Sequence, residues 1–155
     1  MTHTLIIGFG NPLAGDDGAG PEVAARLNGR PGLVVTLTHQ LTPELAADVA
    51  AARRVIFIDA ATTGEGVVVA VLKPNPGAPA LTHTVGPEAI LALADRLYGH
   101  CPPAFLVTVP GVRFAPGAGL SARTRRHLPE AMRAVERLLE APGYEPPPFV
   151  LTPEP

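Results

Sequence analysis

Several residue types that support common chemistries are nearly missing from this 155-residue chain, which has one cysteine, one serine and one lysine. The lone Cys101 cannot form an internal disulfide, which suits a reducing compartment. A phosphate-binding P-loop needs a lysine after its glycines, and Lys73 has no such place. Ser121 lies in Leu-Ser-Ala-Arg rather than in a G-x-S-x-G elbow, so a helix cap explains it better than nucleophilic catalysis.

The chain also lacks a long apolar run and an excess of either charge. No stretch of about 18 apolar residues is present and the N-terminal segment has no basic region, so neither a membrane span nor a signal peptide is expected. The net charge is −2, which gives no reason to expect nucleic acid or a membrane surface as a partner. These absences predict a cytoplasmic protein, which we expect to be a monomer.

What the chain does contain is an alternation of apolar strands and helices, typical of a parallel sheet covered on both faces. We expect strands over residues 4–9, 33–38, 55–59, 67–72 and 104–109, the fourth of them as an antiparallel edge. The pattern predicts an α/β fold with a single three-layer α/β/α domain over residues 1–141. Its sheet would be five-stranded, twisted and mostly parallel, and a Pro-rich tail would follow over residues 142–155.

Four helices are expected between these strands. The first spans residues 17–27, and the second runs from a cap at Thr42 to residue 52. The third begins at Pro87 and ends before Gly99, which suits a helix C-terminus. Its apolar face is predicted to hold Ile90, Leu91, Ala94, Leu97 and Tyr98. The fourth is capped by Ser121, and Pro129 should kink it or divide it in two.

The first strand leads into a glycine-rich turn with two adjacent acids, GFGNPLAGDDGAG (residues 8–20). A dinucleotide site is not indicated, because the third glycine of G-x-G-x-x-G is missing and the second strand ends without a ribose-binding acid. Asp16 and Asp17 are two of only five aspartates in the chain. They lie at a helix N-terminus, where a carboxylate is favoured for helix stability alone.

A carboxylate and an imidazole elsewhere are predicted to join these acids. Asp59 ends an apolar strand, where a buried carboxylate needs partners, and His83 follows a Pro-rich loop. Ligands of open α/β sheets bind beyond the carboxyl ends of the strands. Two carboxylates and one imidazole suit a divalent first-row metal, held as a permanent cofactor or recognised on a substrate. Each residue alone also has an ordinary structural explanation.

Three motifs resemble those of the [NiFe]-hydrogenase maturation endopeptidases. IIGFGNPLAGDDGAG (residues 6–20) is similar to that family's opening signature, and IFIDA (residues 56–60), which contains Asp59, is similar to its second motif. His83, just before Gly-Pro-Glu, falls where the family has its histidine.

The resemblance implies an endopeptidase that removes a short C-terminal extension from a hydrogenase large-subunit precursor after nickel insertion. Asp17, Asp59 and His83 would be the catalytic, nickel-contacting groups, with Asp16 a neighbour whose role stays open. Nickel would be carried by the substrate rather than stored. Whether nickel polarises the scissile carbonyl or activates water, or a carboxylate acts as the base, stays open as well.

One segment departs from the family pattern. Many members have Asp-Gly-Gly-Thr after the second strand, whereas this chain has THQLTPEL (residues 38–45). Together with TVPGVRF (residues 108–114), this segment is similar to the branch serving bidirectional, NAD(P)-linked hydrogenases. His39 and Gln40 either replace the glycine loop at the cleft or form a partly buried, hydrogen-bonded pair.

Two other functions stay open on the sequence. Peptidyl-tRNA hydrolases also begin with an apolar strand and a Gly-Asn-Pro turn, but they place a catalytic histidine where this chain has Asp16 and Asp17. They also present a basic surface, which the net charge of −2 does not favour. The third function is a noncatalytic nickel chaperone that uses the same three ligands.

Overall fold

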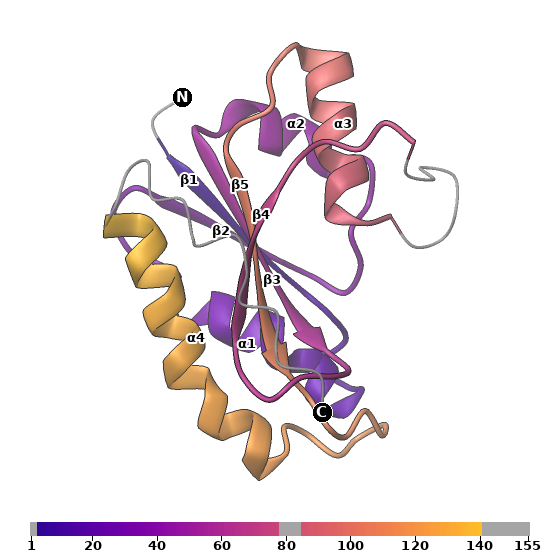
Figure 1. The fold of residues 1–155 in the computed structure, drawn as a ribbon, viewed down its shortest axis with the longest axis vertical. Helices are drawn as coiled ribbons and strands as arrows, with labels where there is room; N and C mark the ends of the chain where they lie inside the picture. The colour runs from indigo at the N-terminus through magenta and orange to yellow at the C-terminus, as the bar shows by residue number, and fades with distance from the viewer. Residues whose placement is uncertain (1–2, 78–84, 141–155) are drawn as a thin grey trace.

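A five-stranded sheet with helices on both faces forms the centre of the computed structural model, which describes residues 3–77 and 85–140 (Figure 1). The strands lie in the order β2-β1-β3-β5-β4. Their bounds are β1 (Thr4–Phe9), β2 (Leu33–Thr38), β3 (Arg54–Ala61), β4 (Val68–Leu72) and β5 (Ala104–Pro110). All pairs are parallel except β4 with β5, so the predicted antiparallel edge is confirmed.

Two helices cover each face of the sheet, which confirms the predicted three-layer α/β/α architecture (Figure 1). α2 (Leu45–Ala51) and α3 (Pro87–Tyr98) pack on one face, and α1 (Ala19–Ala25) and α4 (Ala122–Glu140) on the other. Successive side chains of a strand point to opposite faces. Leu5 and Ile7 of β1 accordingly join the α2–α3 core, while Ile6 joins the α1–α4 core. Burial on both faces explains why these strands are apolar throughout.

The strand order reverses between β1 and β3. After β1 the chain passes through α1 to β2 on one side, and after β2 it returns through α2 to β3 on the other side. The two connections lie on opposite faces, so the carboxyl ends of β1 and β3 are neighbours that no single connection covers. In open α/β sheets this reversal is where ligands bind.

Two glycines allow α1 to lie directly on the sheet. A Cβ added to Gly20 of α1 would come 2.3 Å from the carbonyl oxygen of Ile58 and 2.8 Å from that of Phe9. A Cβ added to Gly8 of β1 would come 2.5 Å from the Cβ of Ala24. The spacing between helix and strands therefore depends on the missing side chains.

The element boundaries differ from the predicted ones by two or more residues in three places. Residues 17–27 do not form one helix, because a 3-10 turn, η1 (Gly15–Gly18), precedes α1 and Gly15 has a φ of 60°. The second helix begins at Leu45, after a turn in which the Leu45 N–H donates to the carbonyl of Thr42 at 3.1 Å. β3 continues two residues past Asp59, because Ala60 and Ala61 still pair with β5.

The predicted apolar face of α3 is buried only in part, and division of the last helix, one of the two effects predicted for Pro129, is wrong. Leu97 and Tyr98 are exposed, so the buried face of α3 ends at Ala94, one turn before the helix does. α4 is one helix rather than two, although Pro129 lies inside it. Pro129 is on the solvent side, where water can satisfy the freed carbonyl, while the apolar face of the helix stays packed. The buried apolar residues of that face are Leu128, Ala131, Ala134, Val135 and Leu138.

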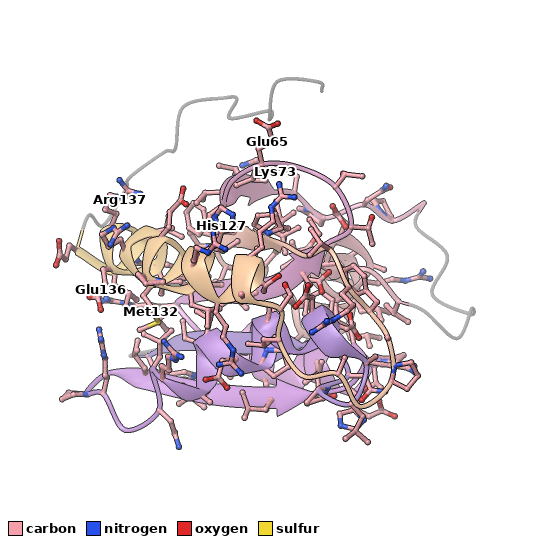
Figure 2. All side chains as sticks on the ribbon, turned by 90° about the horizontal axis from the view of Figure 1, so that it is seen from below. Glu65, Lys73, His127, Met132, Glu136 and Arg137 are labelled. Atoms are coloured by element: carbon pink, nitrogen blue, oxygen red, sulfur yellow. The ribbon has the colours of Figure 1, made fainter. Side chains whose placement is uncertain are left out.

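Polar contacts hold both ends of α4. Ser121 caps its start as predicted, because its Oγ accepts from the N–H of Thr124 at 3.2 Å. At the other end the buried guanidinium of Arg54 donates to the carbonyl of Leu138. Glu136 lies on the side of α4 that faces the N-terminal part of the chain, where it pairs with Arg30 (Figure 2). Hydrogen bonds thus hold α4 at its start and near its end.

Within the described residues, no helix combines the length and the apolar character that crossing a membrane requires. The predicted tail over residues 142–155 lies outside the described residues, so the proposed domain boundary stays a prediction.

We expect Gly20→Ala to lower the free energy of unfolding by about 3 kcal/mol, at the upper end of the usual cost of overpacking. The added Cβ would collide with backbone carbonyls that no side-chain rotation can move, which outweighs the gain in helix propensity of about 1 kcal/mol. Urea denaturation followed by circular dichroism measures the change. Gly66→Ala is the matched control, because its Cβ would meet only the Glu130 carboxylate, at 3.8 Å. Equal stability of the two variants would contradict the tight fit of α1.

Candidate active site

Asp17 lies in the turn that follows β1, at the carboxyl edge of the sheet. The chain leaves β1 through Gly10, whose φ of 140° no other residue type adopts readily. It then folds back, so that Asp17 Oδ2 accepts a hydrogen bond from the N–H of Asn11 at 2.6 Å. Among the residues that the structure describes, no donor is assigned to the other carboxylate oxygen of Asp17, and the residue is only partly buried.

Asp59 lies on the neighbouring strand β3, in register with Thr108 of β5. Its Oδ1 accepts a hydrogen bond from the N–H of Ala60 at 2.8 Å. Burial raises the pKa of Asp59 to about 6; the Ala60 hydrogen bond opposes this rise and the negative charge of Asp17 adds to it. The two predicted carboxylates therefore lie close enough to interact, at the strand-order reversal between β1 and β3.

Asp16 has a different environment, although it is the next residue to Asp17. Its side chain is fully buried, and it accepts from the N–H groups of Val112 and Arg113, both at 2.9 Å. The N–H and the Oγ of Ser121 also donate to it, at 2.7 and 2.8 Å. Burial alone would raise the pKa of Asp16, but these four hydrogen bonds outweigh it and hold the pKa well below its usual range.

Asp16 therefore has a structural role, since it holds together segments that are distant in the sequence. The sequence placed its supporting role at the start of the first helix, whereas its donors lie about 100 residues away, between β5 and α4. Nothing near Asp16 in the sequence identifies these donors. Ser121, explained from sequence as a helix cap, both caps α4 and binds Asp16.

His83, the third predicted site residue, lies outside the described residues, so its placement beside Asp17 and Asp59 stays a prediction. Within residues 3–77 and 85–140, no three His, Cys, Asp or Glu side chains are grouped closely enough to hold a metal ion. The described part of the site is thus a pair of carboxylates.

His39 and Gln40 follow β2, on the far side of β1 from Asp59. Both are exposed, so the prediction of a partly buried pair is wrong. The carbonyl of Gln40 accepts from Thr38 Oγ1 at 2.8 Å, which only closes the turn after the strand. Because β2 is an edge strand, its end is open to solvent rather than enclosed by neighbouring strands.

Two apolar side chains near the carboxylate pair have no counterpart in the sequence-based predictions. Leu13, in the turn before Asp17, is 70% exposed, and Val112, after β5, is 51% exposed. The carbonyl of Leu13 accepts from the N–H of Gly117 at 2.7 Å, so the two loops are joined. Leu13 and Val112 are thus exposed apolar side chains on two loops that are hydrogen-bonded to each other.

The same fold occurs in solved structures of hydrogenase maturation proteases. HycI from Thermococcus kodakarensis KOD1 is similar over 90% of this chain and 94% of its own, with a TM-score of 0.69 and 19% identity. HybD, a hydrogenase maturating endopeptidase from E. coli, is similar over 89% and 92%, with a TM-score of 0.68 and 24% identity. A hydrogenase 2 maturation peptidase from a Thaumarchaeota archaeon covers 89% and 98%, with a TM-score of 0.67 and 24% identity.

These structures define the class to which the architecture belongs: the chain has the α/β fold of the hydrogenase maturation proteases. No model of a protein family and no curated protein sequence matches the chain.

The raised pKa of Asp59 predicts that Asp59→Asn gains stability relative to the wild type as pH rises. Free aspartate titrates at 3.8 and folded Asp59 at about 6, so between these values the folded state keeps a proton that the unfolded state has released. Wild-type stability therefore falls through this window, and the neutral asparagine removes that fall. Urea denaturation of metal-free protein at about pH 4 and about pH 7.5 measures the difference.

Asp95→Asn is the control for this measurement, because it removes the same charge from an exposed position on α3. A constant stability difference between Asp59→Asn and the wild type at both pH values would contradict a raised pKa at Asp59.

Proposed function

We propose that this chain is an endopeptidase that removes the C-terminal extension of a [NiFe]-hydrogenase large-subunit precursor after nickel has been inserted. One observation carries the proposal: Asp17 and Asp59 lie together at the strand-order reversal of a fold shared with hydrogenase maturation proteases. Among the described residues, Asp17 and Asp59 each accept a single hydrogen bond, whereas Asp16 accepts four. The pair is therefore available for a ligand.

Nickel belongs to the substrate in this proposal and serves as the recognition element. Asp17 and Asp59 would contact the nickel carried by the precursor, and His83 would complete the set. Carboxylate and imidazole groups suit such a cation, and the precursor's own ligands would fill the remaining coordination positions. A pair of carboxylates without a permanently bound metal would hold a precursor only when the precursor brings the metal.

The protonation state of Asp59 would couple nickel arrival to the chemistry. With a pKa of about 6, the Asp59 carboxyl exchanges its proton near neutral pH. An approaching cation favours the charged carboxylate, so contact with nickel would release that proton. Asp59 would then be a nickel ligand, or it would take a proton from the water that attacks the scissile carbonyl. Nickel itself would supply polarisation of that carbonyl or of the water.

The large subunit would approach the site over the apolar surface at Leu13 and Val112, and cleavage would take place in the cytoplasm by a monomer. That the hydrogenase belongs to the NAD(P)-linked branch is supported only by the sequence of residues 38–45 and 108–114. No nucleic acid or membrane takes part in this reaction.

Asp17→Ala, Asp59→Ala and His83→Ala should each lower the rate of precursor cleavage by at least about 100-fold, the usual contribution of a group that acts on the reacting atoms. Each purified variant is incubated with nickel-loaded precursor, and the released C-terminal peptide is followed by mass spectrometry. Circular dichroism checks that each variant is folded. Asp95→Ala, an exposed acid on α3, is the control and should cleave like the wild type.

The same assay with nickel-free precursor tests the recognition element, and we expect no peptide release. Cleavage of nickel-free precursor at an equal rate would contradict recognition through nickel. Binding of nickel-loaded precursor without cleavage would identify a chaperone, and release of amino acid from peptidyl-tRNA would identify a peptidyl-tRNA hydrolase. Both results would overturn the proposed endopeptidase.

A further inference from the structure

Asp16 is a fully buried acid that the proposed reaction does not use, next to one that it does. Its carboxylate binds two segments at once: the N–H groups of Val112 and Arg113 after β5, and Ser121 at the start of α4. Its own N–H donates back to the carbonyl of Arg113 at 2.7 Å. The turn that holds Asp17 is therefore bound to residues 112–113 through both the backbone and a side chain.

The segment that Asp16 binds is itself tied to the strand of Asp59. The N–H of Gly111 donates to the carbonyl of Ala61 at 2.8 Å, two residues after Asp59. Asp59 is also in register with Thr108 of β5. Two structural routes therefore connect Asp17 to Asp59: the pairing of β1 with β3, and the path through Asp16, residues 111–113 and Ala61.

The residues along the second route are closely packed. A Cβ added to Gly15 would come 2.3 Å from the carbonyl oxygen of Arg113, and a Cβ added to Gly111 would come 2.9 Å from the Cβ of Asp16. Neither glycine could therefore carry a side chain without displacing Arg113 or Asp16. Movement of residues 111–113 would pass directly to the turn that carries Asp17.

We propose that Asp16 is a positioning residue of the cleavage reaction, which holds Asp17 at its working separation from Asp59 through residues 111–113. This inference rests on the proposed function. Asp16 does not touch the substrate, because its side chain has no exposed surface and its oxygens are occupied by four donors. It acts through the geometry of the carboxylate pair.

A purely structural role for Asp16 would give a different result from a positioning role. Loss of a structural contact lowers stability and leaves the folded fraction fully active. Loss of positioning lowers kcat in folded protein, because a misplacement of about 1 Å costs on the order of 100-fold in rate. The test rests on kcat of the folded protein rather than on KM, because Val112, a donor to Asp16, also belongs to the proposed precursor-binding surface.

Two variants and one control separate these roles. Asp16→Asn places an amide against backbone donors, and Ser121→Ala removes the Oγ bond while the carboxylate and its three backbone donors remain. Arg54→Met is the control, because it removes a buried hydrogen bond from the other end of α4, at the opposite edge of the sheet. Thermal unfolding and the kinetics of precursor cleavage are measured for all three.

We expect Asp16→Asn to lower kcat of the folded protein on the order of 100-fold, and Ser121→Ala to lower it by a smaller factor. Arg54→Met should lose stability but keep kcat. If folded Asp16→Asn and Ser121→Ala keep the wild-type kcat, or if Arg54→Met loses kcat equally, the positioning role is overturned. Should Asp16→Asn fail to fold, Ser121→Ala decides the question.

A readout without activity separates this inference from the proposed function. If the wild type cleaves no precursor, the proposed function fails, and crystal structures of the wild type and of Ser121→Ala test the positioning. A shift of the Asp17 carboxylate relative to Asp59, on the order of 1 Å, would support it. An unchanged separation would overturn it.

Discussion

The buried carboxylate of Asp16 is the interaction on which the rest of this structure depends. A charge without solvent exposure is costly unless hydrogen bonds replace its hydration, and Asp16 receives four of them. Because three come from backbone N–H groups, they fix the course of the chain rather than the rotamer of a partner. The turn after β1, the segment after β5 and the start of α4 are held around one group.

The environments of three aspartates show how one residue type takes different roles. Asp16 is surrounded by donors and stays ionised, whereas partly buried Asp59 has one donor among the described residues and a neighbouring negative charge, so its neutral form is favoured. Asp17, whose charge acts on Asp59, accepts one hydrogen bond from the described part of the chain. A carboxyl group whose pKa is raised by burial and a neighbouring charge, as at Asp59, is often found at functional sites.

The sequence predicted the sheet well, for a physical reason. Strands such as β1 and β3 are buried on both faces, so they read as continuous apolar runs that stand out from the helices. The prediction that Asp17 and Asp59 meet followed from the shared carboxyl edge of parallel strands, and the raised pKa of Asp59 is consistent with it. Local patterns placed the helix ends less well, as at Thr42 and Leu97, because tertiary packing decides which turns are kept.

The role of Asp16 could not be predicted, because none of its donors is near it in the sequence. The intact α4 had a related cause: Pro129 signals a break by itself, but the packed face of the helix outweighs that local signal. For His83 the sequence remains the basis of the assignment.

The separation of 105 residues between Asp16 and Ser121 has a consequence for the order of folding. Closing a long loop costs entropy that only the contacts made afterwards repay, so such links form late. A chain still emerging from the ribosome can carry both Asp17 and Asp59 before Ser121 has been synthesised. Both aspartates of the pair would then be present in the chain before their geometry is fixed, which happens only once α4 has docked.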